Sequence, residues 1–476
     1  MDKSIKSKFL KIYNSPTFNT WSSLATRSLN IIVLIPFILK KFCPSEVSLW
    51  YLFGTIASFN FLFELGFGPS FIRAISYGVG GASSMKTRDG DGLPNTKFLK
   101  HIWQNTKVVY LLLAILFFLI LIFGGYFIVQ KPINFLSNKS DGWLTWSITI
   151  IGTTFSFWGN MFTVYLQGVN KIALFRRYET IFSLCSIISC AIGINLGLDF
   201  VGLVILIQFW NIISVLRNYL ICKNDEIYAK IKSNFTFKID KTIIKDLWSS
   251  SWRSAIGMVM SFGIINSSAL YYAQLDDVKE VSSYLFCFRI LQIIISFSMA
   301  PFYTKIPELA RLYITNDNVN LVKIAKKGMM ISHYTFVFST ILIGLFAPYA
   351  LNLIGSSVQF IDNKLWAVLI IAFFIERYGA MHMQLYSVTN IIIWHIANSI
   401  TGVILLVLLI LTLPSLKFYA FPLSMIIAYL GFYSWYASKK SLKLLNLNFF
   451  QFERYILFFP ALILIIYVTF IMIYDF

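Results

Sequence analysis

The stretch Val108–Val129 reads VVYLLLAILFFLILIFGGYFIV and contains no charged residue. Crossing the hydrocarbon core of a bilayer, about 30 Å thick, takes roughly 20 helical residues, and this run is long enough. Apolar and polar residues do not alternate within it, as they would in a strand of a membrane β-barrel. The run therefore predicts a transmembrane helix over 106–129.

Similar apolar runs recur along the whole 476-residue chain, which is 57% hydrophobic and only 13% charged, with a mean hydropathy of +0.71. Soluble proteins carry about 25% charged residues. The runs predict further helices at 18–40, 46–68, 143–167, 178–197, 199–221, 253–273, 281–303, 328–348, 365–386, 391–412, 418–437 and 456–474. The predicted fold class is all-α: a polytopic helical membrane protein with about 12 to 14 transmembrane helices, thirteen by count.

The formal net charge of +19 comes mainly from lysines and arginines in short segments between the apolar runs. With a cytoplasmic N-terminus, most of these bases fall on the inner side, chiefly in the segments 86–100, 171–177, 223–245, 305–327 and 439–454. This asymmetry follows the positive-inside rule, so we attribute the charge to topology rather than to a nucleic-acid partner. The first apolar run lacks a small-residue cleavage site and is expected to be retained as a helix.

Two sequence motifs occur once in each half of the chain and in the same order. Trp21-Ser22-Ser23 with Arg27-Ser28 reappears as Trp248-Ser249-Ser250 with Arg253-Ser254, and Glu46-Val47-Ser48 reappears as Glu280-Val281-Ser282. We therefore predict two six-helix bundles related by a pseudo-two-fold axis along the membrane normal, an arrangement typical of transporters. The expected divisions are an N-terminal lobe over 1–221, a cytoplasmic linker over 222–247, a C-terminal lobe over 248–440 and an additional transmembrane helix within 441–476.

Charged side chains inside a span are costly in the bilayer and normally face a cavity or a partner. Arg27 and Arg253 occupy equivalent places in the two halves, where they could line a shared cavity, although snorkelling to the cytoplasmic headgroups is the alternative. Arg289 lies near the middle of its span, with no acidic residue one turn away. We predict that these three arginines bind an anionic substrate.

Four further charged residues are candidates for a gate or for coupling. Glu64 and Arg73 bracket a glycine- and proline-containing segment where the second helix would bend, which indicates either a hinge or a simple helix end. Glu376 and Arg377 lie at mid-depth of another span, but neighbouring residues on a helix point about 100 degrees apart. We expect them to face different partners, either in transport or in a structural ion pair.

Neither an enzyme nor a metal site is indicated. The histidines at 101, 333, 382 and 395 are scattered with no acidic neighbour at catalytic spacing, and the five cysteines form no CxxC pair. No Walker loop for ATP occurs. We therefore expect no cofactor and no catalytic residue.

The two-half organisation, the early arginine in each half and the stretch FELGFGPSFIRAISYGVGG at 63–81 resemble the polysaccharide transporters of the multidrug/oligosaccharidyl-lipid/polysaccharide (MOP) superfamily, especially Wzx-type O-antigen flippases. The resemblance implies a MATE-like fold and an inner-membrane location. It further implies alternating access through a cationic central cavity for undecaprenyl-diphosphate-linked oligosaccharide. A glycan polymerase and a chain-length regulator are the protein partners that it suggests.

Two other functions are weighed against this one. Cation-coupled multidrug exporters of the same superfamily need intramembrane carboxylates in the N-terminal half, where this chain offers only Glu64. Membrane glycan polymerases or ligases would carry catalytic groups on a long outer loop. The longest polar stretches here, 81–105 and 222–247, are both predicted to be cytoplasmic.

Overall fold

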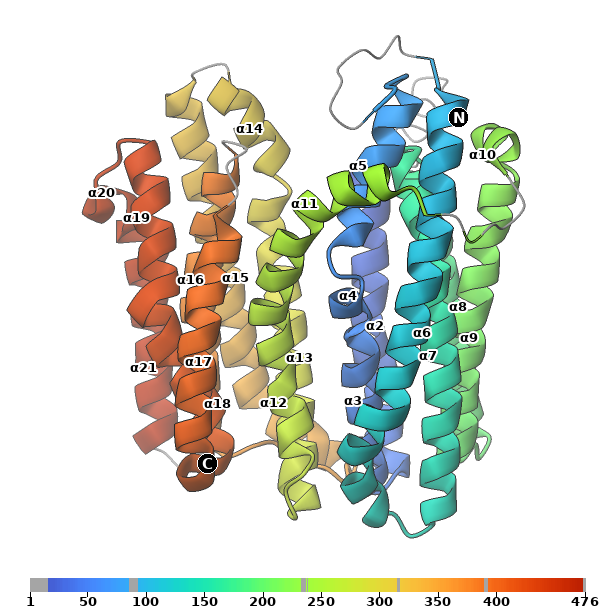
Figure 1. Ribbon diagram of the computed structural model, residues 1–476. Coiled ribbons are helices and arrows are strands. Elements are labelled where there is room, and N and C mark those ends of the chain that lie inside the picture. The colour runs from blue at the N-terminus through green and yellow to red at the C-terminus, as the bar shows by residue number, and fades with distance from the viewer. Residues whose placement is uncertain are drawn as a thin grey trace, which may run out of the picture. The chain divides into compact units, whose positions relative to one another are not determined.

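The computed structural model describes residues 16–84, 93–232, 237, 239–314, 317–388 and 393–473. Within these residues the secondary structure is helical and contains no strand, as the sequence predicts. The chain forms two compact units, Met1–Ala255 and Ile256–Phe476, with their boundary inside α11 (Lys241–Met258). Figure 1 shows the order of the helices along the chain.

Each range predicted for the first half contains helix in the first unit, and only the range 46–68 is interrupted. In chain order they are α2 (Pro16–Lys41), α3 (Pro44–Ser58), α4 (Asn60–Phe63), α5 (Phe67–Val79), α6 (Thr96–Asn134), α7 (Lys139–Gly168), α8 (Ile172–Asn195), α9 (Phe200–Lys223) and α10 (Glu226–Ile231). The short helix α10 lies in the polar segment 222–247 that is predicted as a linker. Helix α11 begins within this segment and extends beyond its end.

The second unit continues α11 through a π-helical turn, Val259–Gly263, into α12 (Ile264–Tyr272). The remaining helices are α13 (Val278–Tyr303), α14 (Ile306–Ile314), α15 (Asn318–Leu353), α16 (Asn363–Ser387), α17 (Trp394–Leu416), α18 (Ala420–Ala428), α19 (Ser434–Leu444), α20 (Phe449–Glu453) and α21 (Phe459–Ile473). Two further π-helical turns, Tyr429–Tyr433 and Arg454–Phe458, join α18 to α19 and α20 to α21.

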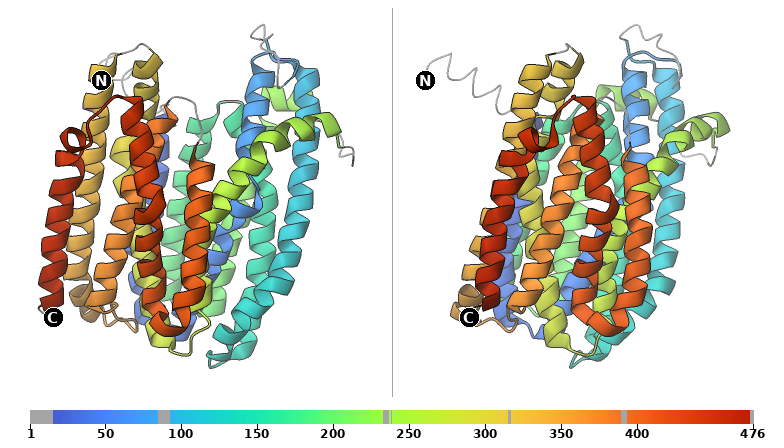
Figure 2. Two further views of the ribbon diagram at one scale, coloured as in Figure 1. Left: turned by 60° about the vertical axis from the view of Figure 1, so that its left-hand side comes forward. Right: turned by 90° about the vertical axis from the view of Figure 1, so that its left-hand side faces the viewer.

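Among the described residues, nine helical segments are long and apolar enough to cross a bilayer. One of them, Trp394–Leu444, contains both α17 and the α18–α19 helix. Both views in Figure 2 show α17 and α18 as an antiparallel hairpin, and the two helices pack against each other. The chain is thus a multi-pass membrane protein, while the total of thirteen spans stays a prediction.

The sequence underestimates the length of α6. The apolar run predicts 106–129, but the helix extends over Thr96–Asn134 because Asn95 caps its N-terminus by accepting the Phe98 N–H at 3.0 Å. At about 1.5 Å per residue, the additional turns carry α6 beyond the hydrocarbon core. The polar segment before the run is therefore partly helical.

The second predicted helix is broken in its middle. Leu65 and Gly66 have φ angles of 49° and 70°, so α4 ends at Phe63 and α5 begins at Phe67. Positive φ is strained for a residue with a side chain, and Gly66 provides the freedom that the second position of the break requires. Because the chain resumes as α5, the break is internal, and the alternative of a simple helix end is wrong.

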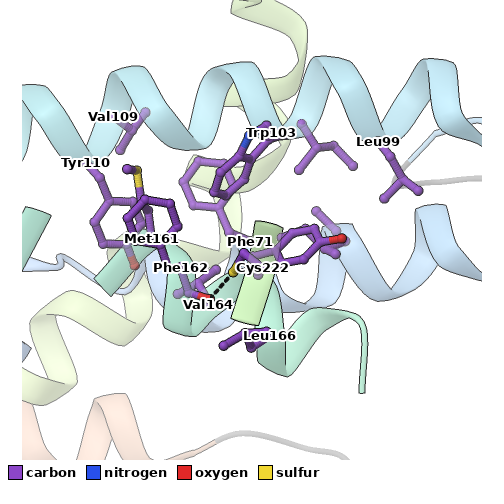
Figure 3. Packing of buried hydrophobic residues seen from close by; sticks show 14 of the residues in the cluster. Phe71, Leu99, Trp103, Val109, Tyr110, Met161, Phe162, Val164, Leu166 and Cys222 are labelled. Atoms are coloured by element: carbon purple, nitrogen blue, oxygen red, sulfur yellow. Dashed lines mark hydrogen bonds between the residues drawn. The ribbon is translucent and has the colours of Figure 1, made fainter. Parts of the chain in front are cut away.

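Buried aromatic and aliphatic side chains from α5, α6, α7, α9 and α11 form the core of the first unit. Figure 3 shows Phe71 of α5 among Trp103 and Tyr110 of α6 and Phe162 of α7. In the same core the Cys222 thiol of α9 contacts the Phe162 carbonyl oxygen at 3.6 Å. The core thus packs α5, the part of the broken helix after Gly66, against α6, α7, α9 and α11.

Glycine allows α7 to approach α9 closely. A Cβ added at Gly159 would lie 2.4 Å from Cγ1 of Val215, and one at Gly152 would meet Gln208 at 2.3 Å. Small residues at such positions let helix backbones pack tightly within a membrane. The spacing of the two glycines places both on the face of α7 that contacts α9.

We expect Gly159→Ala to lower the thermal unfolding midpoint of the purified protein. The stiff, β-branched Val215 must shift to accept the new methyl group, and overpacking of this kind costs about 1–3 kcal/mol. Gly54→Ala in α3 is the matched control, because no neighbouring side chain lies within 4 Å of the added Cβ. Equal midpoints for the two variants would contradict this account of the helix contact.

A polar network fastens the end of the first unit where α7, α8 and α10 meet. The buried Asp225 carboxylate accepts the Tyr165 hydroxyl at 2.5 Å and the Tyr228 N–H at 3.0 Å, and it forms an ion pair with Lys171. Burial opposes ionisation of Asp225. The Lys171 ammonium and the two hydrogen bonds nevertheless hold the pKa of its carboxyl below the usual value.

The pH dependence of stability follows from this shift. A depressed pKa in the folded state stabilises the fold above the ordinary aspartate pKa of about 4, and that contribution is lost as the pH falls through the folded-state pKa. We expect Asp225→Asn to unfold at a lower temperature than the wild type at pH 7, with the difference shrinking below about pH 4. Glu226→Gln at the exposed neighbouring position is the control. A pH-independent difference would contradict the role of the charge.

Candidate functional site

Arg289 lies close to the middle of α13 and belongs to a polar chain on the second unit. Its Nη1 donates to Oε1 of Gln292 at 3.0 Å, and Nε2 of Gln292 donates to Oδ1 of Asn266 in α12 at 3.0 Å. Asn266 is buried and donates in turn to the carbonyl oxygen of Phe262 at 2.8 Å. The chain holds one side of the guanidinium in place.

The Arg289 side chain is exposed on the surface of the second unit. A guanidinium at this depth is costly against lipid tails, so the face of α13 that carries it requires a polar or anionic environment. Phe262, which accepts the last hydrogen bond of the chain, lies in the π-helical turn before α12. Such turns occur frequently at functional sites.

The structure places the other two arginines in the first unit. Arg27 lies in α2, and its side chain is outside the described part of the structure. Arg253 lies in α11, where its exposed guanidinium is 5.5 Å from the centroid of the Trp252 ring. A cavity lined jointly by the three arginines stays a prediction.

Hydrogen bonds connect α2, the helix that carries Arg27, to α8. The Ser23 hydroxyl donates to Oε2 of Glu179 at 2.7 Å, and Arg176 pairs with the same oxygen at 2.7 Å. From the sequence, Arg176 is predicted only to lie in an inner basic segment, and its pairing with Glu179 is not predicted. Glu179 lies in the first turn of the predicted span 178–197, and a carboxylate at such a position indicates that it has a polar partner.

Glu64 lies at the break between α4 and α5. Its carboxylate accepts the hydroxyl of the fully buried Tyr110 from α6, and a Cβ added at Gly68 would lie only 2.4 Å from it. Gly68 therefore leaves the space that the carboxylate occupies at the start of α5. The N-terminal end of a helix stabilises a negative charge through its dipole.

The structure does not pair Glu64 with Arg73. The Arg73 guanidinium donates to the Ser70 hydroxyl at 3.3 Å, three residues earlier in α5. The Ser251 hydroxyl of α11 also donates to Ser70, at 2.9 Å, so α5 and α11 are joined here. A partly buried carboxylate at the break is thus followed, at the start of α5, by a contact to α11.

The expectation that Glu376 and Arg377 face different partners is wrong. Nε of Arg377 lies 2.9 Å from Oε2 of Glu376, and Nη2 lies 3.2 Å from Oε1, so the two neighbours pair with each other. Although their Cα–Cβ directions diverge, the long arginine side chain bends back to reach the carboxylate. Arg377 is buried, which favours a structural role for the pair.

A buried contact between a histidine and a carboxylate within the second unit is not predicted from the sequence. Nε2 of His382 in α16 lies 2.9 Å from Oε1 of Glu453 in α20, and both side chains are completely buried. Nδ1 of His382 lies 2.7 Å from the Ser441 hydroxyl of α19. The sequence spacing does not reveal this contact, because folding brings together residues that lie far apart in the chain.

Among the residues that the structure describes, no group of three His, Cys, Asp or Glu side chains is placed to hold a metal ion. The polar residues of interest are instead single arginines, a carboxylate at a helix break and ion pairs. The two units thus define a helical membrane protein with charged groups inside its spans.

Solved structures of membrane transporters have a fold similar to that of this chain. An inward-facing multidrug resistance MATE family transporter of the MOP superfamily superposes with a TM-score of 0.66 at 14% identity, covering 90% of this chain and 95% of that one. The lipid II flippase MurJ in an inward closed conformation gives 0.61 at 14% identity, covering 95% and 98%. An outward-facing MATE transporter gives 0.56, also at 14% identity, covering 92% and 97%.

The chain therefore has the fold shared by MATE transporters and MurJ over nearly its whole length. No family model matches the sequence, and no curated protein matches it. The predicted MATE-like fold is confirmed.

Proposed function

We propose that this protein is a flippase for lipid-linked oligosaccharide in the bacterial inner membrane. It takes an undecaprenyl-diphosphate carrying an O-antigen or related repeat unit from the cytoplasmic to the periplasmic leaflet by alternating access. Arg27, Arg253 and Arg289 line the predicted cationic cavity and contact the diphosphate or acidic sugars. The protein performs no enzymatic step, and a glycan polymerase and a chain-length regulator act with it.

The observation that carries this proposal is Arg289, in a fold that MurJ, a lipid II flippase, also has. Arginine remains charged in surroundings of low dielectric and pairs bidentately with phosphate. An anionic diphosphate headgroup is therefore the substrate chemistry that a guanidinium at this depth favours.

Glu64 supports a second candidate, a cation-coupled multidrug exporter. Its carboxylate is partly buried at an internal helix break, the kind of position where a membrane transporter binds a coupling ion. The fold is equally compatible, since MATE transporters share it. The arginine at mid-span argues against a cationic drug as substrate, because like charges repel in a desolvated cavity.

Deletion of the gene in its own host tests the proposal. We expect deletion to abolish long surface glycan and lipid-linked repeat units to accumulate on the cytoplasmic side, and the wild-type gene to reverse both effects. Intact surface glycan after deletion would contradict the proposal. A gain in sensitivity to cationic drugs with unchanged glycan would favour the exporter.

A further inference from the structure

A polar cavity of about 690 Å³ opens at one end of the second unit. Its walls come from the start of α13, the link 356–362 between α15 and α16, and the turn Ser415–Tyr419 between α17 and α18. Figure 1 shows these connections at the same end of the unit. The volume lies within the range of about 300–1,000 Å³ of small-molecule sites. The predicted topology assigns all three segments to the outer side of the membrane.

Hydrogen bonds between the walls give the cavity a defined shape. The Tyr419 hydroxyl donates to Oδ2 of Asp362 at 2.6 Å, and the same oxygen caps α16 by accepting the Lys364 and Leu365 N–H groups at 3.1 and 3.3 Å. Beneath the turn, the buried Tyr272 hydroxyl lies 3.2 Å from the carbonyl oxygens of Lys417 and Phe418. The link 356–362 and the turn Ser415–Tyr419 are thus joined directly, and Tyr272 holds that turn from below.

The backbone of one wall is strained. Lys417 has φ 44° and ψ −120°, a conformation that residues with a side chain rarely adopt. Strain of this kind costs about 1–3 kcal/mol, persists only where surrounding contacts enforce it, and concentrates at functional sites. Here the Tyr272 hydroxyl and the packing of its ring against Phe418, 4.9 Å between centroids, enforce it.

The lining is polar and balanced in charge. Two lysines, Lys279 and Lys417, and two carboxylates, Glu280 and Asp362, line it, and no ion pair between these side chains occurs in the part of the chain that the structure describes. Gln359 and several serines add neutral donors and acceptors. The balance disfavours a strongly charged ligand, and the polarity disfavours an apolar one.

Aromatic rings complete the lining. Phe360 and Tyr419 are partly exposed in it, and Phe418 is buried in its floor. Phe360 is steadied from behind by the buried Trp366, whose ring lies 5.0 Å away in a T-shaped contact. A sugar ring presents hydroxyls around its edge and C–H groups on its faces, so amide, carboxylate and ammonium groups beside flat rings match it on both counts.

We propose that this outer cavity is a saccharide-binding site that accommodates neutral hexose and N-acetylhexosamine units. It goes beyond the proposed flippase function, because the site lies within one unit and needs no transport to bind its ligand. The sugar can come from a lipid-linked glycan that has reached the outer leaflet or from free surface glycan, and both offer the same hydroxyl-rich rings.

Saturation-transfer NMR on the purified full-length protein tests the site, with neutral oligosaccharides of hexose and N-acetylhexosamine as probes. We expect transfer to the sugar ring protons for the wild type and about a tenfold weaker affinity for Glu280→Gln combined with Gln359→Ala, because two hydrogen bonds to the sugar are weakened or lost. Both positions are exposed, so the fold should tolerate the substitutions. Lys364→Ala, exposed near the cavity but outside its lining, is the matched control and should bind as the wild type does.

Competition experiments identify the source and the chemistry. Displacement of the probe by a lipid-linked glycan in nanodiscs assigns the site to the transported molecule, and displacement by lipid-free polysaccharide alone assigns it to surface glycan; either result supports a saccharide site. No transfer to any sugar, an unchanged affinity in the double variant, or displacement by inorganic pyrophosphate alone would overturn the proposal. If the wild-type protein binds the sugar but does not transport lipid-linked oligosaccharide, the result counts against the proposed function and not against this site.

Discussion

Replacing Arg289 with glutamine is expected to lower transport of lipid-linked oligosaccharide about 100-fold while the protein still inserts into the membrane. Glutamine can keep a hydrogen bond to Gln292 but removes the charge and the fork that would pair with phosphate. A charge-assisted contact in a desolvated cavity contributes about 3 kcal/mol, which corresponds to about two powers of ten. The measurement is the initial transport rate in proteoliposomes at low substrate concentration.

Two variants sharpen this test. Arg289→Lys keeps the charge but loses the bidentate geometry, so we expect an intermediate, roughly tenfold reduction. Arg454→Gln is the matched control, because its exposed guanidinium lies 5.6 Å from the Tyr455 ring, near the N-terminal end of the helical segment Phe449–Ile473 rather than at the middle of a span. Wild-type rates for Arg289→Gln, or equal losses for both glutamine variants, would contradict a role of Arg289 in gripping substrate.

Glu453→Ala is expected to be the most destabilising single substitution considered for the second unit. It leaves the completely buried His382 without its carboxylate partner, and breaking a buried pair by removing one member costs about 3–5 kcal/mol. The thermal unfolding midpoint in detergent should fall by on the order of 10 °C. The loss arises because the pair joins α16 to α20, which precedes the last membrane helix.

The double variant His382→Leu with Glu453→Leu separates charge from packing. Replacing both members of a buried pair with apolar residues is often neutral, so the midpoint should return most of the way to that of the wild type. Glu308→Ala breaks the exposed pair with Lys305, 3.2 Å apart, and should change the midpoint little. A double variant as unstable as Glu453→Ala would show that packing, not a buried polar group left without its partner, explains the loss.

The positions of the membrane helices can be predicted from the sequence because of the physics of the bilayer. Apolar runs of about 20 residues have few alternatives to a helix, because every backbone polar group must find a partner within the segment. Within the described residues each predicted range accordingly falls mainly on helix, apart from the break in 46–68; residues 391, 392 and 474 of the predicted ranges lie outside the described part. The ends of the helices are harder to predict from the sequence, since the extension of α6 depends on the Asn95 cap rather than on hydropathy.

The break in the second helix was only partly predictable. Gly66, Gly68 and Pro69 signal a weak point, but the positive φ of Leu65 and the space that Gly68 leaves for the Glu64 carboxylate depend on three-dimensional packing. Side-chain pairs were the least predictable feature. His382 and Glu453 are far apart in the sequence, and the Glu376–Arg377 pair depends on how a long side chain bends.

The central claim is that the protein moves a lipid-linked oligosaccharide between leaflets. The direct measurement uses purified protein in liposomes that contain a fluorescent undecaprenyl-diphosphate oligosaccharide, with a membrane-impermeant quencher reporting the fraction exposed at the outer leaflet. We predict that the wild type equilibrates the label between leaflets faster than protein-free liposomes and that Arg289→Gln does not. A rate for the wild type equal to that of protein-free liposomes would contradict the account.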